Sequence, residues 1–469
     1  MNKKNNLIKN TLILGIGKMS TQLISFLLLP LYTIFLSPSE YGTVDLIVTY
    51  VALSAPAITI QLEMASFRFL IDARNDESEK QKIISNVLRT TALILLTCII
   101  LFWAVGLFIN IPYFSLILLI VCSTVFANIF LQFARGLGDN KKYTIASVLT
   151  GLTIVITNII LIVFLHMGVQ GMLLSITLAN LIGCIYLFFT LNIYRYINFK
   201  NHNKKLQKEL IKFSFPLVPN GVSWWIINVS DRTIISIAIG VAANGIYAIA
   251  NKYSAIVTGV ISILNMSWTE SASLHISSDD RDSFFSDIHN AIIKLYGSLG
   301  LVVIAYIPFV FNILVDSRFD EAYLYIPILL VAAFLNAVAG LYGAIYVAKR
   351  LTKKVATTTA VAAIINLILT IGLIEFMGIY AAAIATAVAY MTVAIYRHYD
   401  VKKYLTITYE KGIFIKMAVL YASVMILYYF NNFICNILSA IIITMIVVLL
   451  NKSIIKTMKN KVLNLSNRK

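Results

Sequence analysis

The sequence predicts an all-α protein that crosses a membrane about fourteen times, and three observations lead to this expectation. Apolar runs of about 20 residues, the length of a membrane-spanning helix, recur from one end of the chain to the other. Of the 469 residues, 59% are hydrophobic and only 13% are charged. The Lys and Arg residues gather in the connections between the runs, nearly all of them on one side. The chain therefore has the pattern of a polytopic membrane protein.

The first apolar run is too long for the apolar region of a signal peptide and lacks a small-residue cleavage site, so it is read as a span. Short polar or basic connections separate each run from the next. The predicted spans are residues 11–36, 42–66, 87–110, 113–136, 144–167, 168–194, 213–240, 242–268, 288–315, 322–348, 355–377, 378–397, 412–430 and 433–451.

The distribution of positive charge predicts the orientation. If the N-terminus is cytoplasmic, 31 of the 38 Lys and Arg residues lie in cytoplasmic segments and one, Arg318, lies on the opposite side. The positive-inside rule then places both termini in the cytoplasm. It also accounts for the net charge of +17 without a nucleic-acid partner.

An internal repeat relates two halves of the chain. Gly42 aligns with Gly245 at an offset of 203 residues, and Tyr50 aligns with Tyr253 at the same offset. Both segments follow an outer turn and enter the membrane in the same direction, which predicts two six-helix lobes related by a pseudo-twofold axis along the membrane normal. The expected parts are a lobe of residues 1–194, a basic cytoplasmic linker of 195–212, a second lobe of 213–397, a cytoplasmic linker of 398–411, two further helices in 412–451 and a basic cytoplasmic tail of 452–469.

The start of the chain and its seventh span resemble a known family. The start reads Gly15-x-Gly17, then Pro30-Leu31-Tyr32, then Leu36-Ser-Pro38-Ser-Glu-Tyr41-Gly42, and the seventh span reads Pro216-Leu-Val-Pro219-Asn220-x-x-Ser223-Trp224-Trp225-x-x-Asn228-x-x-Asp231-Arg232. Both are similar to the O-antigen and oligosaccharide repeat-unit flippases, often called Wzx, of the multidrug/oligosaccharidyl-lipid/polysaccharide exporter superfamily.

This resemblance implies an alternating-access flippase of the bacterial cytoplasmic membrane. The implied substrate is an undecaprenyl-pyrophosphate-linked oligosaccharide, such as an O-antigen repeat unit, moved from the cytoplasmic to the outer leaflet and coupled to an ion gradient. Membrane lipid is an implied partner, together with the polysaccharide polymerase and the chain-length regulator.

The seventh span carries two charges at membrane depth, Asp231 and Arg232, and such charges face a cavity or a partner. Asp231 lies level with Lys252 across the turn to the next span, so the two can pair, either as a packing device or as a pair that breaks during transport. Arg232 is left without an obvious partner, and a guanidinium can bind a pyrophosphate bidentately.

The second span carries Asp45 and Glu63, eighteen residues or five helical turns apart, so both are expected on one face of that helix. Either carboxylate can take up a proton or Na⁺, or can simply be a charge at a helix end. Lys18 of the first span is expected within reach of Glu63. With Arg232 and Lys252, Lys18 makes the predicted cavity positive, which suits an anionic head group.

Polar and aromatic side chains of the seventh span suit a sugar, because rings stack on a pyranose and amides bind its hydroxyls. The residues are Asn220, Trp224, Trp225 and Asn228. The alternative reading for this set, a packed helix interface, stays open.

No enzyme site, metal site or cofactor site is predicted. The chain has no Walker A pattern, and its four cysteines lie in apolar runs without metal-ligand spacing. A membrane glycosyltransferase or polymerase is the alternative from another class, and the short outer connections disfavour it. A multidrug or cation antiporter of the same superfamily is disfavoured by the three cations named above, and a flippase for the peptidoglycan precursor differs mainly in cargo.

Overall fold

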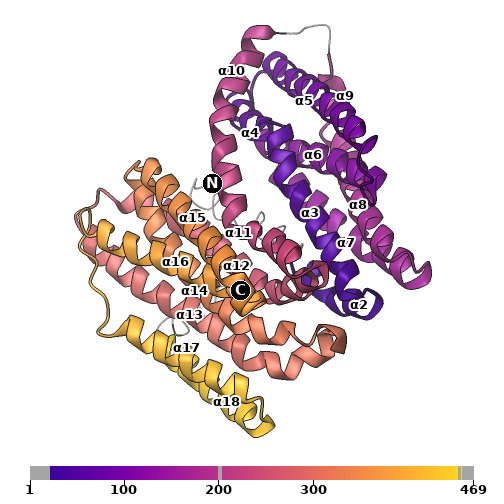
Figure 1. The fold of residues 1–469 in the computed structure, drawn as a ribbon. Helices are drawn as coiled ribbons and strands as arrows, with labels where there is room; N and C mark the ends of the chain where they lie inside the picture. Colours follow the sequence, from indigo (N-terminus) through magenta and orange to yellow (C-terminus); the bar gives the residue numbers. More distant parts are fainter. Residues whose placement is uncertain (1–21, 199–202, 453–455, 457–469) are drawn as a thin grey trace, which may run out of the picture. The chain divides into compact units, whose positions relative to one another are not determined.

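In a computed structural model of the chain, every regular element among residues 22–198, 203–452 and 456 is a helix (Figure 1). Those are the residues that the structure describes, with the backbone alone at 220, 222–228 and 266. The chain divides into two compact units, Met1–Gly245 and Ile246–Lys469. The lobe boundaries expected from the repeat stay a prediction.

Most helices of the first unit are long and follow one another through short turns. They are α2 (Leu29–Phe35), α3 (Pro38–Ile58), α4 (Leu62–Asp72), α5 (Glu77–Gly106), α6 (Phe114–Gly136), α7 (Asn140–Asn158) with the π-helical η1 (Ile159–Phe164), α8 (Gly168–Thr190), α9 (Ile193–Tyr196), α10 (Lys204–Ser214), the 3₁₀ turn η2 (Phe215–Leu217) and α11 (Val218–Ala238).

Helix α12 (Val241–His275) begins in the first unit and continues in the second. The remaining helices belong to the second unit alone. They are α13 (Arg281–Leu314), the 3₁₀ turn η3 (Ser317–Phe319), α14 (Ala322–Ala348), α15 (Thr352–Met377), α16 (Ile379–Val401), α17 (Ile413–Phe430) and α18 (Phe433–Leu450).

Within the described part of the chain, 12 helices are long and apolar enough to cross a membrane, and each coincides with a predicted span. The protein is therefore a multi-pass membrane protein. Two predicted spans are not among the twelve. The first is described only as the short apolar helix Gln22–Phe35, and α11 is too polar to qualify because it holds Asp231 and Arg232. The count of fourteen spans stays a prediction.

The first unit has an apolar core to which α4, α5, α6, α8 and α10 contribute. Leu62 from α4 and Phe133 from α6 are almost completely buried in it. The amphipathic α10 buries Leu206 and Leu210 against α4 and α5 while its lysines stay exposed. Residues 204–212 of the predicted linker thus belong to a packed helix.

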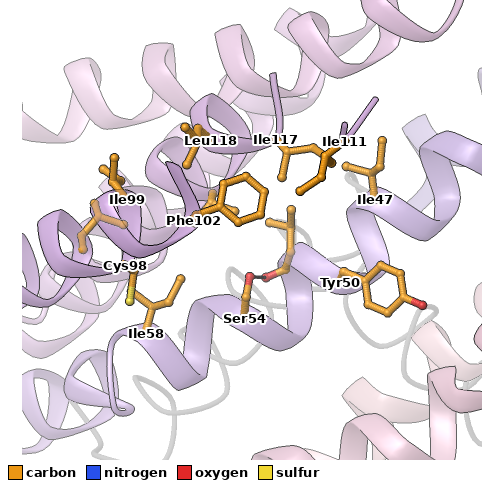
Figure 2. Close-up of a pocket in the computed structure, with 13 residues that line it drawn as sticks. Ile47, Tyr50, Ser54, Ile58, Cys98, Ile99, Phe102, Ile111, Ile117 and Leu118 are labelled. Atoms are coloured by element: carbon orange, nitrogen blue, oxygen red, sulfur yellow. Dashed lines mark hydrogen bonds between the residues drawn. The ribbon is translucent and has the colours of Figure 1, made fainter. Parts of the chain in front are cut away.

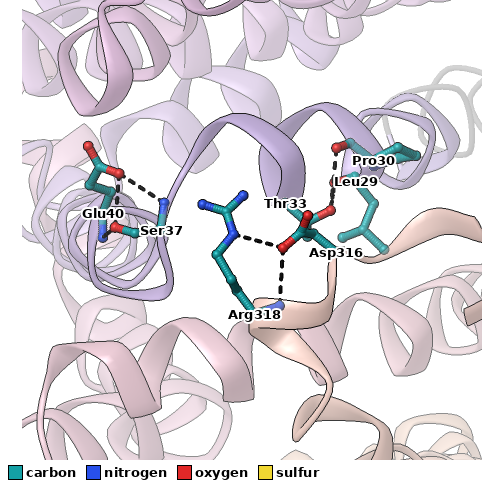
Figure 3. Close-up of polar contacts among 7 residues, drawn as sticks. All are labelled: Leu29, Pro30, Thr33, Ser37, Glu40, Asp316 and Arg318. Atoms are coloured by element: carbon teal, nitrogen blue, oxygen red, sulfur yellow. Dashed lines mark hydrogen bonds and ion pairs between the residues drawn. The ribbon is translucent and has the colours of Figure 1, made fainter. Parts of the chain in front are cut away.

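A capping box fixes the start of α3 (Figure 3). The backbone N–H of Ser37 donates to Glu40 Oε2 at 2.8 Å, and the N–H of Glu40 donates to Ser37 Oγ at 3.3 Å. Pro38 occupies the first turn, where its missing N–H costs nothing. These local signals set the position along α3 of every residue in its first turns.

The second predicted span, residues 42–66, is not one continuous helix. It breaks between α3 and α4, where Ile60 and Gln61 take positive φ angles of 50° and 57°. Pro56 lies one turn before the break and cannot donate a backbone hydrogen bond. The expectation that Asp45 and Glu63 share one helix face is therefore wrong, because the rotation per residue is not kept through the break.

The second unit is built around α14, which packs against α13, α15, α16 and α17. Its partner α16 buries a row of alanines, and small residues let two helices approach closely. Helix α16 packs against both α14 and α15, and in the first unit α8 packs in the same way against both α6 and α7. The packing of the two units thus agrees with the sequence repeat.

Helices α17 and α18 lie against α13. Tyr421 of α17 donates to the Gly297 carbonyl at 3.1 Å, and Asn451, next to the end of α18, donates to Ser298 Oγ at 2.7 Å. Before α14, Arg318 Nε donates to Asp316 Oδ1 at 2.7 Å (Figure 3). The single cation predicted on the outer side is therefore an exposed turn residue.

Candidate functional site

Helix α11 holds Arg232 against α3. Arg232 Nη1 lies 2.8 Å from Asp45 Oδ1 and donates a second hydrogen bond of 3.1 Å to Thr49 Oγ1. Asp45 and Thr49 are one turn apart on α3 and so face the same way. The side chains of Asp45 and Arg232 are 12% and 22% exposed, which makes this a largely buried ion pair.

The expectation that Arg232 lacks a partner is wrong. It followed from comparing depths within one helical hairpin, whereas Asp45 lies on a helix nearly two hundred residues earlier in the chain. The guanidinium can donate a further hydrogen bond, because Nε is buried and has no hydrogen-bond partner among the described residues. This donor is already desolvated, so an acceptor that reached it would not have to displace water from Nε.

The first turn of α12 is tied to the same carboxylate. Asn244 Nδ2 donates to the Gly42 carbonyl at 3.1 Å and to Asp45 Oδ2 at 3.3 Å. Tyr50 OH donates to Thr233 Oγ1 at 3.1 Å, next to Arg232. Asp45 therefore binds two segments at once, α11 through its Oδ1 and α12 through its Oδ2.

The glycines of the repeat contact each other in this cluster. A Cβ on Gly42 would lie 2.0 Å from the Val241 carbonyl oxygen, and one on Gly245 would lie 2.0 Å from the Pro38 carbonyl oxygen. The contact is reciprocal, since Pro38 and Val241 are separated by the same 203 residues as the two glycines. The start of α3 and the start of α12 thus cross backbone to backbone at the two glycines.

The ion pair has no counterpart at the repeat-related positions of the sequence. At the offset of 203 residues, Arg232 corresponds to Leu29, and Asp45 corresponds to Ala248. The symmetric crossing is therefore held by an asymmetric polar cluster. We call the contacts of Gly42, Asp45, Thr49, Arg232, Asn244 and Gly245 the crossing cluster.

Glu63 lies away from this cluster, in the first turn of α4 after the break. It is 7% exposed, and its Oε2 has no hydrogen-bond partner among the described residues. Its predicted neighbour Lys18 lies outside the described residues.

The other predicted site residues are described only in part. Asp231 is buried and Lys252 is half-buried, and their pairing stays a prediction. The helix α11 contains the four sugar-binding candidates, but their side chains lie outside the described residues. These candidates are Asn220, Trp224, Trp225 and Asn228.

A hydrocarbon-lined cavity of about 330 Å³ lies between α3, α5 and α6 (Figure 2). Tyr50 and Ser54 of α3, Phe102 of α5 and Ile117 of α6 are among the residues around it. The Ser54 hydroxyl donates to the Val51 carbonyl at 3.1 Å, so it does not need a hydrogen-bond acceptor from a molecule in the cavity. The cavity suits a hydrocarbon chain and offers little to a sugar.

The family follows from a comparison of the sequence with known families. Residues 7–269 match the family described as polysaccharide biosynthesis protein, and this match spans more than half of the 469 residues. The chain belongs to the polysaccharide biosynthesis protein family. Among curated proteins, none matches the chain.

Solved transporters share the fold of this family member. The lipid II flippase MurJ in an inward closed conformation superposes with a TM-score of 0.70 at 17% identity, covering 96% of this chain and 100% of that one. A multidrug resistance MATE family transporter of the MOP superfamily, in an inward-facing conformation, gives a TM-score of 0.65 at 13% identity, covering 88% and 96%. A structure of a multidrug resistance MATE family transporter of the MOP superfamily in an outward-facing conformation gives a TM-score of 0.58 at 15% identity, covering 88% and 96%. The chain therefore shares its fold with these solved transporters.

Two polar residues of the crossing cluster, Thr49 and Asn244, were not predicted as site residues from the sequence of this family member. A signal for Asn244 was present, because it directly precedes the repeat glycine Gly245 and therefore lies at the crossing of the two helices. Thr49 gave no signal of its own, since threonine is common in apolar helices.

Proposed function

We propose that this protein is a flippase that moves a polyprenyl-pyrophosphate-linked oligosaccharide, an O-antigen or similar repeat unit, across the bacterial cytoplasmic membrane by alternating access. Membership in a polysaccharide biosynthesis family supports the cargo class, and the shared fold with a lipid II flippase supports the mode of transport. The positive-inside pattern supports cytoplasmic termini. The polymerase and the chain-length regulator remain proposed partners.

The observation that carries the proposal is the half-buried Arg232 side chain, bound to Asp45 through Nη1, whose buried Nε has no hydrogen-bond partner among the described residues. A pyrophosphate carries more negative charge than Asp45 and can bind a guanidinium through two parallel hydrogen bonds. It can therefore compete with Asp45 for Arg232. Lys18 and Lys252 are proposed to add positive charge, and the aromatic and amide residues of α11 are proposed to contact the sugar.

Competition for Arg232 gives the substrate a way to act on the protein. Asp45 also accepts from Asn244, so losing Arg232 changes the contacts at the first turn of α12. The substrate would then loosen the crossing of Gly42 and Gly245 as it binds. A ligand shifts a conformational equilibrium only through such a difference in binding between two states.

The cation antiporter is the weaker alternative. A cationic drug would need a free carboxylate, and Asp45 is neutralised by Arg232. A glycosyltransferase or polymerase is weaker still, since the solved structures that share this fold are transporters and a flippase.

Complementation tests the proposal. A strain that lacks its own repeat-unit flippase would receive the wild type, Arg232→Ala, Arg232→Lys or the control Arg318→Ala, which changes an exposed cation outside the cluster. At matched membrane levels, we expect wild type and Arg318→Ala to restore surface polysaccharide. We expect Arg232→Ala to fail and Arg232→Lys to restore little, because lysine cannot bind bidentately. Full activity of Arg232→Ala would contradict the assigned substrate contact, and lowered drug accumulation without complementation would favour the antiporter.

A further inference from the structure

A strained break lies between α3 and α4. Ile60 and Gln61 both occupy the left-handed region, which is especially unfavourable for a β-branched residue such as Ile60. Such residues are strained, and strain of this kind concentrates where a protein binds or moves. The break also touches α11, since the Gln61 side chain lies against Gly221.

A buried carboxylate follows the break directly. Glu63 is 7% exposed and lies beside the buried Leu62 and Ala65. The nearby Ser66 hydroxyl donates to the backbone carbonyl of Glu63 at 2.7 Å and not to its carboxylate. The Thr59 side chain lies close enough to interact with the carboxyl group, while Oε2 has no hydrogen-bond partner among the described residues. A charged carboxylate in such a place is strongly disfavoured, and uptake of a proton removes the charge.

The charged side chains of the helices packed against α4 are engaged elsewhere or face outward. Arg135 of α6 stacks on Phe67 at 4.6 Å, and Arg74 donates to the Gly136 carbonyl at 2.8 Å. Arg68 of α4 pairs with Asp72 in an exposed ion pair. The charged residues of α10 are exposed.

Two further charged residues, Arg89 and Asp45, must be considered as partners or alternatives to Glu63. Arg89 of α5 is the remaining cation on the span portion of these helices, and it donates no hydrogen bond to Glu63 Oε2. Asp45, the other carboxylate of the predicted second span, is occupied by Arg232. Of the two coupling candidates, only Glu63 is both buried and free of a cation in the described structure.

The surroundings of Glu63 suit a proton better than Na⁺. Sodium sites at broken helices use several oxygen ligands, including backbone carbonyls freed by the break. Here the carbonyls of Pro56, Ala57 and Thr59 already accept N–H groups at 3.1, 3.2 and 3.0 Å. In the described part of the chain, no group of three or more His, Cys, Asp and Glu residues lies close enough to hold a metal ion.

We propose that Glu63 is the proton-binding carboxylate through which a proton gradient drives transport, an inference that rests on the proposed flippase function. Oε2 takes up one proton to give the neutral acid and releases it later, and no other bond changes. The charged form requires water or a cation and the neutral form does not, so the two forms favour different arrangements of the break. Gln61 passes this difference to α11, the helix that carries Arg232.

Infrared difference spectroscopy tests the site without any substrate. The full chain in lipid nanodiscs would be compared at acid and alkaline pH, with and without NaCl. We expect the carbonyl band of a protonated carboxylic acid at neutral pH, where an exposed glutamate is ionised. The band should vanish in Glu63→Gln, shift in Glu63→Asp and persist in Asp45→Asn and Arg89→Gln. Thermal melting checks that each variant is folded, and Glu63→Asp keeps the test decisive if Glu63→Gln does not fold.

Two results would overturn the proton site. The first is a spectrum that is the same in the wild type and in Glu63→Gln or Glu63→Asp, or a band that changes with added Na⁺ and not with pH. The second is a carboxylic-acid band that appears only in Lys18→Met, which would mean that Lys18 keeps Glu63 ionised. Neither result bears on flipping itself, so the two proposals fail separately.

The driving force is tested in proteoliposomes. An imposed pH gradient should accelerate flipping by the wild type at least tenfold more than by Glu63→Gln, and an imposed Na⁺ gradient should have no effect. Equal acceleration of both proteins by the pH gradient would overturn the coupling role of Glu63. Flipping that ignores both gradients would overturn it as well.

Discussion

Gly42 and Gly245 contact each other through their backbones, so that a methyl group on either would overlap a carbonyl oxygen of the opposite helix at 2.0 Å. A polar cluster surrounds this crossing on one side, where Asp45 binds both α11 and α12. The crossing is close enough to allow only glycine, and we propose that a substrate anion can replace Asp45 at Arg232. These two properties suit a contact that closes and opens.

The first prediction concerns the glycines. Gly42→Ala and Gly245→Ala should each prevent the close crossing, because the new methyl group would meet a backbone carbonyl, which cannot move aside as a flexible side chain can. Overpacking of this kind destabilises a protein by about 1–3 kcal/mol. We expect a lower melting temperature and faster labelling, from the outer side, of a cysteine introduced at Ala243. Gly372→Ala is the matched control, since nothing lies within 4 Å of its Cβ position. Unchanged labelling in both variants would refute the closed crossing.

The second prediction concerns the ion pair. A double-mutant cycle of Arg232→Met and Asp45→Asn should give a favourable coupling energy of about 1–2 kcal/mol, below the value for a fully buried pair because both side chains are partly exposed. Thermal or chemical unfolding of the four proteins in detergent measures it. Asp45→Asn alone should raise the affinity for a pyrophosphate-linked lipid, because it removes the competing anion. A weaker affinity would contradict competition at Arg232.

The sequence alone indicated much of this fold and part of this site. Apolar runs and the charge of the connections predicted the positions of the described spans, because a helix in lipid requires a long run of apolar residues. The repeat placed Gly42 and Gly245 at corresponding positions, although it did not say that they touch. Arg232 was singled out by its depth in the membrane.

Other features could not be predicted for physical reasons. The break at Ile60 and Gln61 runs against local preference, since neither residue favours a left-handed conformation, and tertiary packing must impose it. The partnership of Asp45 with Arg232 depends on how separate hairpins pack. Depth comparison within one hairpin carries no information about such a contact.

The third prediction concerns a buried arginine of the second unit that belongs to structure and not to transport. Arg397 is 5% exposed and donates to the Ala339 carbonyl at 2.9 Å and to Thr358 Oγ1 at 2.6 Å. Arg397→Ala should lower the free energy of unfolding by about 3–5 kcal/mol, because it leaves a cavity and unpaired acceptors between α14, α15 and α16.

The exposed Lys402, just after α16, supplies the control for that measurement. Lys402→Ala should change the unfolding free energy by less than about 0.5 kcal/mol. An equally small effect of Arg397→Ala would show that the arginine does not hold these helices together.

The flipping assay tests the central claim most directly. The purified full chain would be reconstituted into liposomes with a labelled undecaprenyl-pyrophosphate-linked oligosaccharide, and the fraction of sugar reached by an external modifying enzyme would be followed over time. The account predicts rapid transfer between leaflets by the wild type and by Arg318→Ala, and a rate in Arg232→Ala close to that of protein-free liposomes. Wild-type protein that leaves the substrate in its original leaflet, or Arg232→Ala that flips as fast as wild type, would contradict the account.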